Sequence, residues 1–182
     1  MIKTILISLE HIIRRLTLGM GYLAALLLIG LLLNVFYDVV MRYLFNDVSI
    51  AMQELEWHLY ATVFLLGVAY TLQTDGHVRV DLIYERLNPQ HQAWINLLGT
   101  VLFVWPFCIV VIYYGIDFAQ SAYQIGEISG DPGGLTQRWL IKSMISLAFG
   151  CVLFSSIGTV LRSVQQLAFV TIKPATTEGA AA

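Results

Sequence analysis

Charge is scarce in this chain. Its 182 residues include 10 basic and 12 acidic residues, which is 12% of the chain, whereas soluble domains have about 25%. Apolar residues make up 58% and the mean hydropathy is +0.74. The formal net charge is -2, and no basic run is longer than Arg14-Arg15, so nothing favours a nucleic-acid partner. The composition predicts an all-α integral membrane protein.

Cysteine is also rare. Cys108 and Cys151 are the only two, and both fall inside apolar segments. Cysteines in such segments behave as small buried hydrophobes and not as a disulfide pair or a metal site. The sequence therefore predicts no redox or metal chemistry from its cysteines.

Long apolar runs are abundant, and they predict four transmembrane helices. Trp57 to Thr74 holds 18 residues with no ionisable group except His58. A helix of that length covers roughly 27 Å, close to the hydrocarbon thickness of a bilayer. Asn88-Pro89 is a typical helix start, and Pro106 predicts a kink. The expected spans are residues 17–41, 50–74, 90–114 and 139–162, within a transmembrane domain of residues 17–165.

The two ends of the chain have a different pattern. Residues 1–16 place apolar residues at steps of three and four with charged residues between them, which is typical of an amphipathic helix on the membrane surface. A signal peptide is the alternative, but the apolar run after Arg15 is too long and no Ala-x-Ala site closes it. Residues 166–182 are expected to form a flexible cytoplasmic tail.

Basic residues predict the orientation. With the N-terminus in the cytoplasm, seven basic residues lie inside and three lie outside, and the positive-inside rule favours that choice. Both termini are then cytoplasmic, and the turn Glu127–Leu135 lies on the outer side of a bacterial inner membrane. The inner set is Lys3, Arg14, Arg15, Arg79, Arg86, Arg162 and Lys173, and the outer set is Arg42, Arg138 and Lys142.

The middle of the membrane carries no obvious chemistry. The central turns of the expected spans hold no charged residue, whereas a self-sufficient transporter needs polar groups at that depth. We therefore expect no catalytic, substrate-binding or metal-binding residue, no cofactor, and no transport by the chain alone. A haem-bearing membrane anchor of a redox enzyme is the alternative, although only His58 of the four histidines lies in a span. The others are His11, His77 and His91.

A series of short motifs resembles a known family. The motifs, in chain order, are Arg42-Tyr43, Glu54-Leu55, Gly67, His77-Val-Arg-Val-Asp81, Glu127-x-Ser129, Gly134-Leu135, Arg138-Trp139 and Lys142. Their order, spacing and four-helix plan resemble the small, DctQ-like membrane subunit of tripartite ATP-independent periplasmic (TRAP) transporters. The Asp131–Leu135 turn is most similar to the branch labelled mannitol, chloroaromatic or 2-oxo-acid transport.

The resemblance implies an accessory subunit of a sodium-coupled importer of organic acids. A periplasmic binding protein would capture the substrate, and a large multi-helix subunit would carry it with sodium ions by an elevator-like movement. The small subunit would brace the stationary scaffold among membrane lipids and would not be an enzyme. The motifs supply candidate structural or subunit-interface residues: Arg42, Glu54, Glu56, Trp57, His77, Arg79, Asp81, Glu127, Arg138, Trp139 and Lys142.

Lys142 is the most testable of these candidates. It lies three residues after Trp139, so about 4.5 Å deeper along its helix. Its ammonium group can reach outward to water and headgroups, or it can pair with Glu54, Glu56 or the large subunit. Arg42 is a second candidate for pairing, four residues after Asp38.

Overall fold

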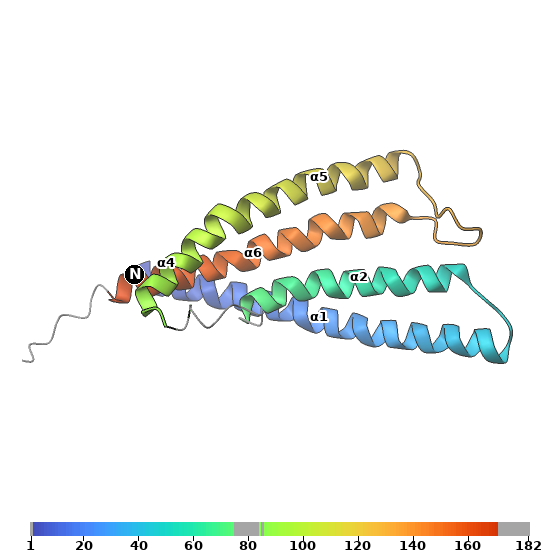
Figure 1. The fold of residues 1–182 in the computed structure, drawn as a ribbon, viewed down its shortest axis with the longest axis horizontal. Coiled ribbons are helices and arrows are strands. Elements are labelled where there is room, and N and C mark those ends of the chain that lie inside the picture. Colours follow the sequence, from blue (N-terminus) through green and yellow to red (C-terminus); the bar gives the residue numbers. More distant parts are fainter. Residues whose placement is uncertain (1, 75–83, 85, 171–182) are drawn as a thin grey trace, which may run out of the picture.

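The fold is a layer of long antiparallel helices. The structure is a computed structural model and describes residues 2–74, 84 and 86–170. It is helical throughout these residues except in turns and connections, with no strand among them, and four of its helices are long and apolar enough to cross a membrane. Figure 1 shows both connections, 45–49 and 125–137, at one end, and the start of α4 at the other. The predicted fold class is confirmed.

Helix α1 (Ile2–Leu44) is continuous through the boundary expected near residue 16. Its 43 residues extend about 65 Å, roughly twice the hydrocarbon thickness. Near its start, Ile13 and Thr17 are buried against the other helices, whereas Ile12 and Leu16 are exposed. The apolar exposed side suits contact with lipid, but the placement of residues 1–16 on the membrane surface stays a prediction.

Helix α2 (Ile50–Gln73) packs along α1. Ser49 caps its first turn, where its side chain accepts a hydrogen bond from the Met52 amide (3.4 Å). The carbonyl of Met52 accepts a hydrogen bond from the buried Asn34 side chain at 2.9 Å. The connection between the helices is only five residues long (45–49), so the two helices run antiparallel.

The third crossing has three parts: α4 (Pro89–Gly99), a π-helical turn η1 (Thr100–Val104) and α5 (Trp105–Gln124). Asn88 caps α4 by accepting a hydrogen bond from the His91 amide (2.9 Å), and Pro89 occupies the first turn, as predicted. The π turn ends just before Pro106, and the Trp105 amide bonds to the Thr100 carbonyl. The wider turn accommodates the missing proline N–H, and Figure 1 shows the chain bending there.

Helix α5 continues to Gln124, ten residues beyond the expected end at 114. The stretch from Gly115 was expected to be non-membrane loop, and its first ten residues are helical instead. Three small residues accompany the extension: Gly115, Ala119 and Ala122 are buried at helical spacing, and such residues permit close packing between helices.

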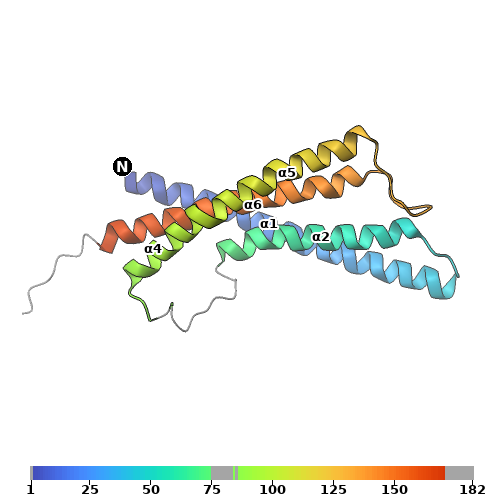
Figure 2. The ribbon, with the colours of Figure 1, turned by 45° about the horizontal axis from the view of Figure 1, so that its top comes forward.

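Helix α6 (Arg138–Val170) is the centre of the layer. It contacts α1, α2, α4 and α5, so the helices lie in the order α1, α2, α6, α5 (Figure 2). The buried core between α6 and its neighbours α2 and α5 consists of Ala69, Cys108 and Val152. The hydroxyl of Ser155 donates to the Ala69 carbonyl at 2.9 Å, and the Trp105 indole donates to Ser156 at 2.9 Å.

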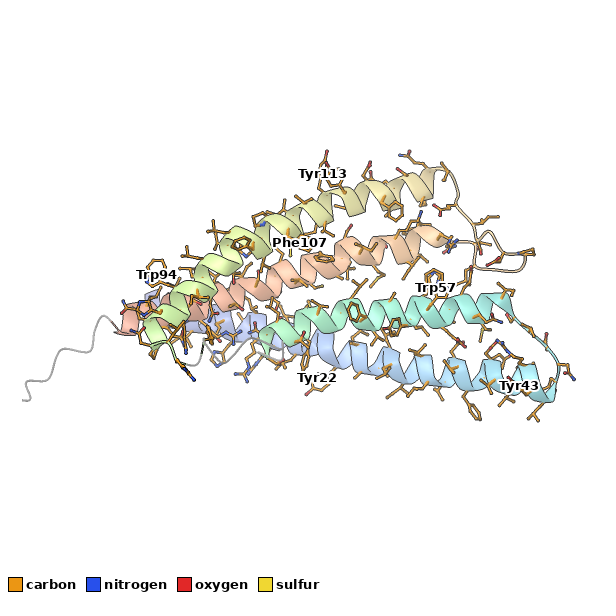
Figure 3. All side chains as sticks on the ribbon, in the orientation of Figure 1. Tyr22, Tyr43, Trp57, Trp94, Phe107 and Tyr113 are labelled. Carbon is orange, nitrogen blue, oxygen red and sulfur yellow. The ribbon has the colours of Figure 1, made fainter. Side chains whose placement is uncertain are left out.

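The outer edges of the layer stay uncovered. Tyr22 on α1 is 77% exposed and Tyr113 on α5 is 70% exposed. Figure 3 shows these two side chains pointing away from the other helices at opposite edges. Much of the apolar surface is therefore available to lipid or to another protein.

Candidate functional site

A buried carboxylate organises the end of the molecule where the 125–137 connection lies. Glu54, in the second turn of α2, is 6% exposed. Its carboxylate accepts a hydrogen bond from the Ser129 hydroxyl and another from the Leu135 amide at 2.6 Å. The sequence identified Glu54 as a candidate structural or interface residue and a possible partner of Lys142. The structure shows that Glu54 holds the connection before α6 against α2.

The connection itself is a compact turn. The Gly134 amide bonds to the Asp131 carbonyl at 3.0 Å, and Gly133 has a positive φ of 83°. The Ser129 amide bonds to the Leu135 carbonyl at 3.0 Å, which closes the base of the turn. A Cβ on Gly134 would lie 2.8 Å from a Glu54 carboxylate oxygen, so glycine is required for this approach. The turn expected at Asp131–Leu135 is present.

Lys142 makes an ion pair, but its partner is Glu127. Its ammonium nitrogen lies 2.5 Å from a Glu127 carboxylate oxygen, and the two side chains are 18% and 27% exposed. The same nitrogen lies 4.0 Å from the centre of the Phe118 ring. The sequence suggested Glu54 or Glu56 as the partner of Lys142, and neither of them pairs with it in the structure. The Glu54 carboxylate already accepts a hydrogen bond from the turn, and Glu56 lies half-buried two residues further along α2.

Arg138 lies beside the same turn. Its guanidinium carbon is 5.7 Å from the centre of the Trp57 ring, across the α2–α6 boundary. Figure 3 shows Trp57 on the side of α2 that faces α6. Trp139 packs edge-on against Tyr123 of α5, with 5.5 Å between ring centres. The Arg138-Trp139 motif thus joins α6 to both of its neighbours.

Arg42 and His58 also make contacts within their own helices. Arg42 pairs with the buried Asp38 one turn earlier on α1, as the sequence suggested. His58 lies one turn after Glu54, and its Nδ1 is 2.5 Å from the Glu54 carbonyl oxygen. His77, Arg79 and Asp81 lie outside the described residues.

Sequence reasoning missed a polar cluster at the opposite end. Arg162 of α6 donates to both the backbone carbonyl and the side-chain oxygen of Gln73, each at 3.2 Å, where α2 ends. Glu10 of α1 lies 3.9 Å from Arg162. A basic residue near the C-terminus of a helix is a common cap, but here the capped helix is a neighbour. Spacing along α6 could not indicate that.

The arrangement of these groups serves structure better than chemistry. The ion pairs and the Glu54 carboxylate lie at the ends of the helices, and each joins different elements or successive turns. Within the described residues, no group of three His, Cys, Asp or Glu side chains could hold a metal ion. The pattern fits a protein that fixes helices in register.

Comparison with known proteins identifies the family. Residues 31–166 match the tripartite ATP-independent periplasmic transporters, DctQ component. The chain belongs to this family. It is also 30% identical over 131 residues to a protein of Haemophilus influenzae described as a TRAP transporter small permease protein, with 71% of this chain and 78% of that protein covered.

Membership of the DctQ family decides between the two functions expected from the sequence, a transporter subunit and a redox-enzyme anchor. A DctQ chain is the small permease component of a transporter and not an enzyme. The alternative of a redox-enzyme anchor is therefore dropped. The family implies association with a large membrane subunit and a binding protein, and the four apolar helices identify a multi-pass membrane protein.

Proposed function

We propose that this DctQ chain is the scaffold subunit of a sodium-coupled importer of an organic acid. It braces the large transport subunit in the inner membrane and does not itself carry substrate. Sodium and substrate bind to the large subunit, and a periplasmic protein delivers the substrate. Both chain termini lie in the cytoplasm, and the turn held by Glu54 faces the periplasm.

One observation carries this proposal: α2, α5 and α6 meet through small or apolar side chains. Ala69, Cys108 and Val152 form the central contact, and Ala148 beside them is 1% exposed. A transport site needs polar or charged groups near the membrane midplane, whereas the charged groups described above lie toward the helix ends. Close packing of small residues without charged groups suits a scaffold.

The function test is reconstitution into proteoliposomes. The chain alone should give no sodium-dependent uptake of organic acids, and the large subunit with loaded binding protein should need it for full uptake. Uptake by the lone chain would contradict the proposal, and so would undiminished uptake by the large subunit without it.

Cysteine labelling tests the orientation. In a background carrying Cys108→Ala and Cys151→Ala, a cysteine at the exposed Asp131 should react with an impermeant thiol reagent in intact cells. A cysteine at the exposed Arg86 should react only after lysis. The opposite pattern would reverse the topology.

A further inference from the structure

A polar cavity lies at the end of the molecule where α2 stops. Its volume is about 340 Å³, compared with about 30 Å³ for one water molecule in the liquid. It contains the Arg162 cluster described above and lies between α1, the end of α2, and α6. The lining residues are Glu10, Arg14, Leu18, Gln73, Thr74 and Arg162. The cavity is therefore large enough for a ligand of several atoms.

The Gln73 side chain brings a buried hydrogen-bond donor to this cavity. Gln73 is 4% exposed, and its Oε1 atom accepts a hydrogen bond from Arg162 at 3.2 Å. That bond fixes the orientation of the amide, because a guanidinium group donates and cannot accept. The Nε2 atom on the other side of the amide finds no hydrogen-bond partner among the described residues. A buried, oriented NH₂ group of this kind calls for an acceptor.

The charged residues of the lining have a net charge of +1. Arg14 and Arg162 contribute two positive charges, and Glu10 contributes one negative charge. Arg162 binds Gln73 and lies 3.9 Å from Glu10. Arg14 lies one turn after Glu10, yet within the part of the chain that the structure describes it makes no hydrogen bond or ion pair. Guanidinium and amide N–H groups together match the oxygens of a phosphate group.

The position of the cavity favours a phosphate that belongs to a lipid. The 24 residues of α2 extend about 36 Å, slightly more than the hydrocarbon thickness of about 30 Å, so the end of α2 lies at headgroup level. Below Arg14, apolar residues continue the same face of α1 at steps of four. We call Leu18, Tyr22 and Leu26 the α1 ridge, and the last two are 77% and 64% exposed. The surface thus passes from basic to apolar, as a phospholipid passes from phosphate to acyl chain.

From these observations we propose that the cavity binds the headgroup of an anionic phospholipid. Arg14, Arg162 and the Gln73 amide donate hydrogen bonds to its phosphate oxygens, and an acyl chain lies along the α1 ridge. A headgroup with one negative charge, such as that of phosphatidylglycerol, matches the net charge of the lining. This lipid site goes beyond the scaffold function and does not depend on it.

Native mass spectrometry of the full-length chain tests the headgroup, with equal amounts of phosphatidylglycerol and phosphatidylcholine in the detergent micelles. The chain should retain one phosphatidylglycerol molecule in preference. Arg14→Gln should weaken its binding about tenfold, the effect of losing one good charged contact, and should fold normally because Arg14 is exposed. Arg15→Gln is the matched control, since Arg15 carries the same charge one residue later and is not among the residues that line the cavity.

Glu10→Gln should have the opposite effect to Arg14→Gln. It removes the carboxylate that competes with the phosphate for Arg162, so phosphatidylglycerol should bind more tightly than to the unmodified chain. Weaker binding to this variant would overturn the proposal. Equal binding to the Arg14 and Arg15 variants would overturn it too, and so would equal retention of phosphatidylglycerol and phosphatidylcholine.

Competition with glycerol phosphate distinguishes a lipid from a soluble phosphate compound. Glycerol phosphate has the same phosphate chemistry but no acyl chain to place on the α1 ridge. It should therefore displace phosphatidylglycerol only at concentrations at least about 100-fold higher than those of the lipid. Displacement at equal concentration would assign the cavity to a soluble phosphate compound and overturn the lipid assignment. The scaffold function is judged separately, by whether uptake requires this chain.

Discussion

The contact between Gly21 of α1 and Tyr70 of α2 gives a sharp test of helix packing. A Cβ built on Gly21 would lie 2.8 Å from the Tyr70 Cγ atom, which is closer than real Cβ contacts allow. Rotation of the ring about its own axis does not move Cγ, so Gly21→Ala must shift the side chain or separate the helices. Gly19, two residues earlier on the same helix, has no such neighbour within 4 Å.

The comparison of Gly21→Ala with Gly19→Ala isolates this clash. Both changes remove one glycine from the same helix, so their effects on helix propensity cancel approximately. Overpacking costs about 1–3 kcal/mol, and Gly21→Ala should be less stable than Gly19→Ala by that amount. For a chain of this size the difference corresponds to roughly 2–12 °C in melting temperature.

The chain supplies its own reporter for the measurement. Cys108 is 1% exposed, and in a background carrying Cys151→Ala a thiol-reactive fluorophore will label it as the detergent-solubilised protein unfolds. Adding Tyr70→Ala should relieve the clash, so the cost of Gly21→Ala should fall sharply in that background. Equal melting temperatures for the two glycine variants, or no relief by Tyr70→Ala, would refute the reasoning.

Two further predictions concern the end held by Glu54. Glu54→Ala should lower the melting temperature clearly more than Glu56→Ala, because only Glu54 accepts the two hydrogen bonds that hold the turn. Equal decreases in melting temperature would show that these hydrogen bonds do not stabilise the turn. Lys142→Ala and Glu127→Ala should show a coupling energy of about 1 kcal/mol or more, since the pair is partly shielded. Lys142→Ala with Glu56→Ala should couple by less than about 0.5 kcal/mol. A coupling energy larger with Glu56 than with Glu127 would instead support the pairing suggested by the sequence.

The sequence located helix starts well where hydrophobicity and local start signals agreed. Helix α2 was expected over 50–74 and runs over Ile50–Gln73. Asn88 and Pro89 start α4 as their chemistry dictates. These features depend on local interactions and on transfer into lipid, and both can be read from neighbouring residues.

The end of α5 was missed because hydropathy reports partitioning into lipid and not helix formation. Asp117 and Gln120 are polar enough to end an apolar window. Gly115, Ala119 and Ala122 nevertheless continue the packed face at steps of four and three. That small-residue spacing was the available signal for a longer helix.

The partner of Lys142 could not be deduced for a different reason. Glu127 is 15 residues away across an irregular turn, and its position depends on the bonds that the turn makes with Glu54. Helical geometry relates residues within one element, but it does not place a side chain on a connection. Pairing along one helix, as between Asp38 and Arg42, was predictable because both residues share a face.

The small residues at the centre of the layer connect its packing to its proposed function. Ala69, Ala148 and Ser155 are each at most 1% exposed, and they allow α2 and α6 to approach closely. Gly115 lets α5 approach α6 on the other side, where a Cβ would overlap the Ser146 hydroxyl oxygen. The positions of the smallest residues therefore set how closely α2 and α5 pack on α6, which suits the proposed scaffold role.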